Sequence, residues 1–182
     1  KYGLESVGRV PLRDMLVKVR NNLYLLPGVS GTTEPDPDEL LQTINDLKTR
    51  FDAVLIDTPP APWEKQIMHR IFPQCDVVYA VVDQSKFSMQ ETAKYAPTLL
   101  AMGVDPNRIR LVINRYNPKL TSIKEIQKSF VSGFRREIKY TPKVAVIMPE
   151  GWEDHVKALA KGRIASGNEW DNAVKELFGE EE

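Results

Sequence analysis

The sequence has little of several residue types that would otherwise define the class of the protein. Its only cysteine is Cys75, so no internal disulfide can form, which fits a reducing cytoplasm. Its two histidines have no cysteine or carboxylate at metal-ligand spacing, which argues against a zinc site. No apolar run approaches the ~20 residues that a bilayer-spanning helix needs. We therefore expect a cytoplasmic protein with no direct insertion into a membrane.

Net charge is also absent, since 25 Lys and Arg balance 25 Asp and Glu, but the charge is unevenly distributed. Residues 108–143 contain ten Lys or Arg against two Asp or Glu, a net charge of +8. Residues 144–182 contain four against nine, a net charge of −5. Apolar residues interrupt the basic segment, so it is not a disordered tail. It indicates either a polyanionic partner or a solvated cationic face.

Five short apolar runs rich in β-branched residues predict the strands of one sheet. They are Leu23–Leu26, Ala53–Ile56, Val77–Val82, Ile109–Ile113 and Val144–Met148. Several are apolar throughout, as in parallel strands covered on both faces. Because helical patterns alternate with these runs, we expect a single α/β domain over residues 1–182. Its sheet should be doubly wound and mainly parallel, with helices on both faces.

Apolar residues at helical spacing mark the helices between these strands. The first pattern comprises Leu12, Met15, Leu16 and Val19. A second, from Leu40 to Leu47, follows Asp36 and Pro37, a capping residue with proline at the first helical position. Thr121 or Ser122 could cap another, and Glu125 stands three residues after Ser122, as in a capping box. Further helices are expected over residues 64–72, 88–102, 152–161 and 169–178.

Polar residues stand where four of the predicted strands end. They are Asp57, Asp83, Asn114 with Arg115, and Pro149 with Glu150. In open α/β sheets, ligands bind beyond the carboxyl ends of the strands, so these residues could share one pocket. They could also be ordinary strand terminators, because Asp, Asn and Pro favour turns.

The most informative strand end lies in FDAVLIDTPPAPW, residues 51–63. Four consecutive apolar residues precede Asp57, which thus stands where a Walker B acid would hold Mg²⁺ directly or through water. Thr58, Pro59 and Pro60 follow, and the two prolines fix the path of the chain. We interpret these three residues as a switch loop that is well placed to respond to a γ-phosphate.

The order of four segments resembles the MinD/ParA family of deviant Walker A ATPases, which have a P-loop NTPase fold. The segments are VLIDTPP, VVDQSKFSMQET, MGVDPNRIRLVINRYNP and VAVIMPEGWEDHVKALAKGRIA. The most specific piece is LVINRYNP, which is typical of the TadZ/CpaE branch in pilus assembly. The resemblance covers about residues 20–178.

This resemblance implies ATP and Mg²⁺ as cofactors and assigns roles to the residues at the strand ends. Asp57 would position Mg²⁺, through water, and the attacking water. Asn114 would read the adenine edge, for which an amide is suited as both donor and acceptor. Arg115 would flank the base or the ribose. Pro149 would place backbone groups beside the adenine, with Glu150 close by.

The sequence lacks the phosphate loop that this family uses. Its form is K-G-G-x-G-K-[ST], whose backbone N–H groups and lysines bind the phosphates. Neither GVSG at residues 28–31 nor GRIASG at residues 162–167 has the lysines of that motif. We therefore expect an N-terminally incomplete ATPase domain, either a piece of a longer chain or a natural remnant. By itself it should not hydrolyse ATP.

Three functional hypotheses follow. The first is a localisation or assembly factor of a pilus or secretion machine, with protein partners and a homodimeric state implied by the resemblance. The second is a non-specific DNA-binding partition module, whose basic charge gives salt-dependent affinity. Its candidate contacts are Lys128, Arg135, Arg136, Lys139 and Lys143. The third is a non-enzymatic protein-interaction scaffold.

Overall fold

The computed structural model describes residues 12–28, 36–58, 64–134, 139–162 and 167–178. Its contacts divide the chain into two compact units, Lys1–Ile71 and Phe72–Glu182, which are described separately here. No helix among the described residues is long and apolar enough to span a bilayer. That the whole chain forms one domain stays a prediction.

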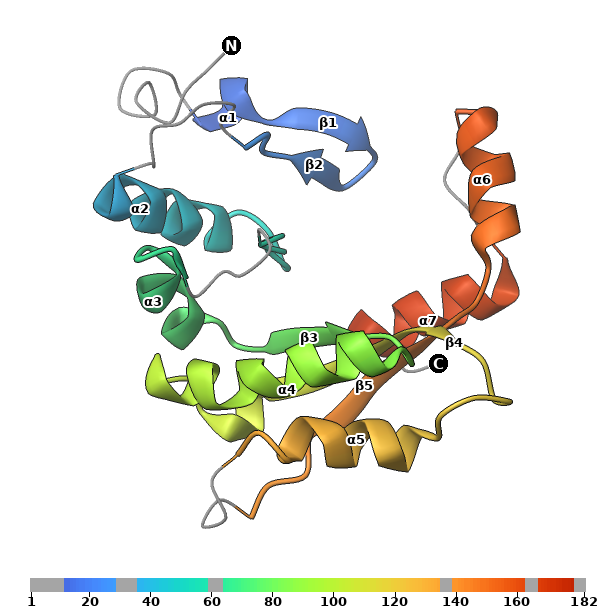
Figure 1. Ribbon diagram of the computed structural model, residues 1–182. Helices are drawn as coiled ribbons and strands as arrows, with labels where there is room; N and C mark the ends of the chain where they lie inside the picture. Colours follow the sequence, from blue (N-terminus) through green and yellow to red (C-terminus); the bar gives the residue numbers. More distant parts are fainter. Residues whose placement is uncertain (1–11, 29–35, 59–63, 135–138, 163–166, 179–182) are drawn as a thin grey trace. The chain divides into compact units, whose positions relative to one another are not determined.

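The first unit opens with a short helix and a hairpin (Figure 1). Helix α1 (Leu12–Met15) leads into strands β1 (Val17–Arg20) and β2 (Leu23–Leu25). The two strands are antiparallel, with Val17 opposite Leu25. The predicted strand at residues 23–26 therefore exists, but it belongs to a hairpin and not to a parallel sheet.

The helical pattern predicted through Val19 is wrong, because the chain turns into a strand after α1. Apolar and basic residues alternate from Val17 to Arg20, which suits a strand as well as a helix. Asn22 then lies in the turn with φ of 61°, a left-handed conformation that asparagine adopts more readily than most residues. The turn and the alternation together select the hairpin.

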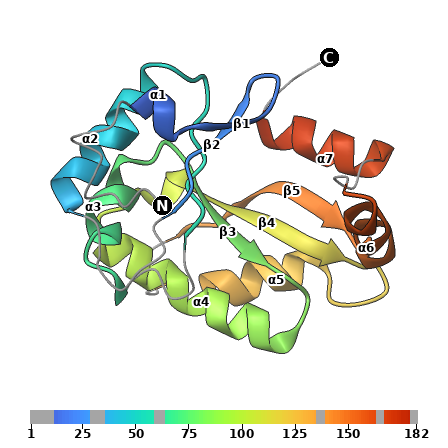
Figure 2. The same cartoon turned by 90° about the horizontal axis from the view of Figure 1, so that it is seen from above.

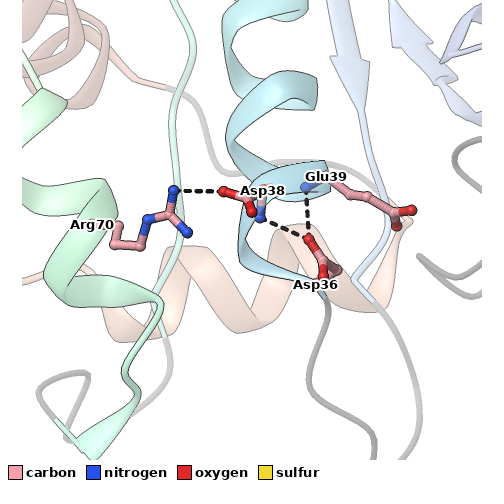
Figure 3. A network of polar contacts seen from close by, with 4 residues as sticks. All are labelled: Asp36, Asp38, Glu39 and Arg70. Carbon is pink, nitrogen blue, oxygen red and sulfur yellow. Dashed lines mark hydrogen bonds and ion pairs between the residues drawn. The ribbon is translucent and has the colours of Figure 1, made fainter.

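Two helices complete the described part of this unit, α2 (Pro37–Lys48) and α3 (Met68–Ile71). The predicted start of α2 is confirmed, because Asp36 Oδ1 accepts hydrogen bonds from the backbone N–H groups of Asp38 (2.8 Å) and Glu39 (3.1 Å; Figure 3). Arg70 of α3 forms an ion pair with Asp38, with 2.6 Å between Nη2 and Oδ1. Both side chains are largely exposed, so this pair contributes at most about 1 kcal/mol.

The predicted strand at Ala53–Ile56 is not formed. No described strand pairs with this segment, and the side chain of Leu55 is 66% exposed. A strand is stable only when a neighbour takes up its backbone hydrogen bonds, and an apolar run does not supply that neighbour. Asp57 therefore follows an unpaired segment and not the end of a sheet strand.

The second unit is built on three parallel strands in the order β3-β4-β5. In chain order its elements are η3 (Phe72–Gln74), β3 (Val78–Val82), α4 (Lys86–Ala101), η4 (Pro106–Arg108), β4 (Ile109–Tyr116), α5 (Ile123–Val131), β5 (Lys143–Pro149), α6 (Trp152–Ala160) and α7 (Asn168–Phe178). The last three predicted strands and the mainly parallel α/β fold are confirmed.

One face of this sheet forms the main core of the unit. Alternate residues of β3 and β4 are buried on it: Val78, Ala80, Val82, Ile109, Leu111 and Ile113. Helices α4 and α5 lie against the same face (Figures 1 and 2), and Ile126 of α5 packs with Val82 and Ile113. Helix α7 packs against β5. On the opposite face of β3, Val81 is 55% exposed.

A proline and a glycine set the contact between α4 and the end of α5. Pro97 lies inside α4 and has no N–H, so the carbonyl of Ala93 lacks the usual donor four residues on. Gly133 comes so close that a Cβ built on it would lie 1.8 Å from that carbonyl oxygen. Only glycine permits this approach of two backbones.

We expect Gly133→Ala to lower the free energy of unfolding by about 3 kcal/mol, because the added methyl group meets backbone rather than a movable side chain. Urea-induced unfolding followed by circular dichroism measures the change. Gly28→Ala is the matched control, because a Cβ at Gly28 would meet nothing within 4 Å. It should change stability by less than about 0.5 kcal/mol. Equal effects of the two substitutions would contradict the close contact.

Candidate functional site

The candidate site lies at the carboxyl ends of β4 and β5. Because the strands are parallel, these ends share one edge of the sheet, and Tyr116 of β4 is paired with Pro149 of β5. Asn114 and Arg115 directly precede Tyr116, and Glu150 directly follows Pro149. The fold thus brings together the four residues that were predicted to bind the base of a nucleotide.

The backbone is irregular at the predicted base-reading residues. The pairing of β4 with β5 shifts register between Ile113 and Tyr116, as in a β-bulge. Within this interval Arg115 has φ of 55°, in the left-handed region that non-glycine residues rarely adopt. Asn114 is half-buried and Arg115 is exposed. Bulges and left-handed residues are concentrated at functional sites, because they redirect side chains at the end of a strand.

Asn117 joins this edge to β5. Its Nδ2 donates a long hydrogen bond of 3.4 Å to Oε2 of Glu150, and its Oδ1 accepts one of 3.0 Å from the backbone N–H of Lys119. The second bond is an Asx turn that starts the loop after β4. Asn117 was not among the predicted site residues. The Asn-Pro dipeptide in RYNP, which favours turns, was the available signal.

Gln84 is the second site residue that the sequence did not reveal. It follows Asp83 at the end of β3, and its side-chain amide makes three hydrogen bonds to the loop after β4. Nothing in the local sequence indicated these bonds, because the partners Asn117 and Thr121 lie more than 30 residues away. The ends of all three strands are therefore linked by polar side chains.

Asp83 itself has a local structural role. Its Oδ1 accepts a hydrogen bond of 2.8 Å from the N–H of Ser85, and its own N–H donates to Oγ of Ser88 at 3.1 Å. Ser85 in turn caps α4 by accepting from the N–H of Ser88. These bonds fit the interpretation of Asp83 as a strand terminator.

The other residues predicted for the nucleotide site belong to the first unit. Asp57 is exposed and Thr58 is half-buried, whereas Pro59 and Pro60 lie outside the described residues. Within the described ranges, no three Asp, Glu, His or Cys side chains are arranged to hold a metal ion. The roles of Asp57 in Mg²⁺ and water positioning, and of the switch loop, stay predictions.

Several lysines of the basic segment are solvent-exposed. They are Lys119, Lys124, Lys128, Lys139 and Lys143. The predicted contacts Arg135 and Arg136 lie outside the described residues. Lys124 and Lys128 lie one turn apart on α5, so they share one face of that helix.

The loop after β4 ends in a capping box at the start of α5, as predicted. The N–H and Oγ of Ser122 both donate to Oε2 of Glu125, at 2.9 and 2.7 Å, and Oγ accepts from the N–H of Glu125. The hydrogen bond from the Ser122 hydroxyl is the main cause that lowers the pKa of Glu125, and Lys128 adds to the effect. Both ends of the loop are thus fixed by hydrogen bonds.

Comparisons with known proteins place the fold. No family model and no curated protein sequence matches this chain. Among solved structures, the chain is similar to the MinD cell division protein of Aquifex aeolicus, with a TM-score of 0.72 and 20% identity over 100% of this chain and 76% of that chain. For the MinC:MinD complex of the same organism, the TM-score is 0.77 and the identity 20%, over 100% of this chain and 75% of that chain. For the septum site-determining protein MinD of Pyrococcus horikoshii OT3, complexed with Mg-ADP, the TM-score is 0.68 and the identity 20%, over 97% of this chain and 72% of that chain. At this identity the likeness establishes a MinD-like P-loop NTPase fold.

We expect Ser122→Ala to raise the pKa of Glu125 towards its ordinary value, because the lost hydroxyl group is one of the two donors to the Glu125 carboxylate and the main cause of the lowered pKa. The folded-state pKa of Glu125 is lowered. Its contribution to stability is therefore present above the unfolded pKa and is lost as the pH falls through the folded pKa. Carboxyl NMR titration of Glu125 measures the shift. Ser132→Ala, at the other end of α5, is the control and should leave this titration unchanged.

Proposed function

We propose that this chain is part of a MinD/ParA-like ATPase domain that positions or assembles a cellular structure and that recognises an adenine base. The observation that carries the proposal is the edge at which Asn114 and Arg115 of β4 stand beside Pro149 of β5 and Glu150, which directly follows it. The amide of Asn114 offers a donor and an acceptor, as the adenine edge requires. The MinD-like fold supports the same assignment.

The residues present fit the base end of a nucleotide better than its phosphate end. The β4–β5 edge offers an amide, a guanidinium group and a carboxylate. For the phosphates, the sequence has no glycine-rich loop with a lysine, and Asp57 is the one residue assigned to Mg²⁺. A bound Mg-ATP would supply the phosphoryl group, and its Mg²⁺ would balance part of the negative charge of the phosphates. We infer that these residues bind and orient the base, and that this chain alone does not turn over ATP.

The finer assignment to pilus assembly rests on the sequence. LVINRYNP at residues 111–118 is the segment most typical of the TadZ/CpaE branch. A homodimer and protein partners belong to this proposal. The homodimer follows from the sequence resemblance, and a protein partner is also supported by the similar structure in which MinD is bound to MinC.

The test of the proposed function is the binding of adenosine, ADP and Mg-ATP to the chain, followed by backbone amide NMR shifts. Because the contacts are to the base, we expect similar, weak dissociation constants for all three ligands, roughly 1 mM, and shifts at residues 114–117 and 149–150. Asn114→Asp should weaken binding about tenfold, because its carboxylate has no donor. Asn172→Asp, on the exposed surface of α7, is the matched control.

Equal binding of guanosine, or unchanged affinity in Asn114→Asp, would refute the assignment of the base site. Tight, micromolar binding of Mg-ATP alone would mean that the phosphates are bound by groups other than those named here. Released phosphate, measured in the same samples, reports on turnover, which we expect to stay at background.

Non-specific DNA binding is a second candidate, favoured by the exposed lysines of the basic segment. We expect retention of random-sequence duplex DNA that falls steeply with salt, because released counterions drive such binding. The double substitution K124E/K128E should weaken retention and reduce the salt slope. K161E/K175E makes the same charge change at exposed positions outside the segment and is the control. Equal loss in both variants, or no retention at 50 mM salt, would exclude this candidate.

A further inference from the structure

Gln84 differs from the other buried polar side chains of the described residues. Three polar residues are buried there, Thr43, Gln84 and Thr92. The hydroxyl groups of Thr43 and Thr92 donate to the carbonyl four residues earlier in their own helices, at 2.9 and 2.6 Å. Such bonds satisfy a hydroxyl group locally. Gln84, at 8% exposure, instead bonds to a segment that is distant in the sequence.

Both N–H donors and the oxygen of the Gln84 amide form hydrogen bonds to the loop after β4. Its Nε2 donates to the carbonyl oxygens of Asn117 (3.0 Å) and Thr121 (2.6 Å), and its Oε1 accepts from the N–H of Asn117 (2.7 Å). A side-chain amide that both donates to and accepts from one residue imitates the pairing of a neighbouring strand. Gln84 therefore holds the backbone of Asn117 as a further strand residue would.

The clamped residue lies between the two predicted base-binding segments. Asn117 stands two residues after Arg115, and its side chain reaches Glu150 at the end of β5. Arg115 keeps a left-handed conformation, which persists only where the surrounding structure fixes the chain on both sides. The ladder with β5 holds Ile113 before this segment and Tyr116 directly after Arg115, and Gln84 holds the backbone of the next residue, Asn117.

We propose that Gln84 is a positioning residue for the segment Asn114–Asn117: it clamps Asn117 so that Arg115 stays left-handed and Asn114 is oriented to read a base. An aliphatic residue would fill the same space without setting the path of the loop. The adenine part of this inference rests on the proposed function, whereas the conformational part is independent of any ligand.

The experiment uses two variants of Gln84 in the full chain. Gln84→Glu keeps the shape but turns a carboxylate oxygen towards two carbonyl oxygens, and Gln84→Met keeps the length without any donor. Gln90→Glu, at an exposed position of α4, is the matched control. Amide exchange at Asn117, the backbone shifts of Arg115 and the adenosine dissociation constant are measured by NMR. Amides of Ile109 to Ile113 show that the sheet remains folded.

In both Gln84 variants we expect the exchange protection of the Asn117 amide to fall at least about tenfold. In Gln84→Met the N–H of Asn117 has no acceptor, and in Gln84→Glu the carboxylate repels the carbonyl oxygens of Asn117 and Thr121, so the loop moves away. The shifts of Arg115 should move away from left-handed values, and adenosine should bind about tenfold more weakly. Gln90→Glu should change none of these.

Unchanged protection of Asn117 would overturn the inference. So would lost protection with unchanged Arg115 shifts, since Gln84 would then only tie down the loop. If the unsubstituted chain does not bind adenosine, the proposed function fails, and the Arg115 shifts still decide whether Gln84 positions the segment.

Discussion

The parallel pairing of β3, β4 and β5 is the constraint on which the rest of the second unit depends. It places three carboxyl ends at one edge, and it fixes which alternate residues face α4 and α5. The buried face then holds the strands in register, so the polar residues after each strand meet without contributing to the core. Asn114, Pro149 and Gln84 are distant in the sequence and neighbours at this edge for that reason.

Elements that depend on short-range signals could be predicted from the sequence. Residues close together in the sequence determine the cap at Asp36, the capping box at Ser122 and the three apolar strands. That polar residues could gather at one edge followed from the same reasoning, because parallel strands end together, whereas their assignment to a base came from the family resemblance. The four residues of the candidate base site lie where the strand ends indicated, although their function stays a proposal.

Features that depend on a distant partner could not be predicted in the same way. The run Ala53–Ile56 has the composition of a strand, but composition does not supply the neighbouring backbone. The segment through Val19 fits two periodicities, and the turn at Asn22 decides between them. Gln84 and Asn117 were missed because a hydrogen bond across more than 30 residues leaves no local pattern. A buried polar residue after a strand is best interpreted once its partners are known.

The close approach of Gly133 to Ala93 also bears on the order of folding. It joins the middle of α4 to the second residue after α5, so both helices must be formed and packed together before the two backbones meet. We expect a contact of this kind to form late in folding, after the strand pairing and the helices. Its strength should therefore govern the rate at which the unit opens more than the rate at which it folds. The lifetime of the folded second unit should then depend on residue 133 having no Cβ.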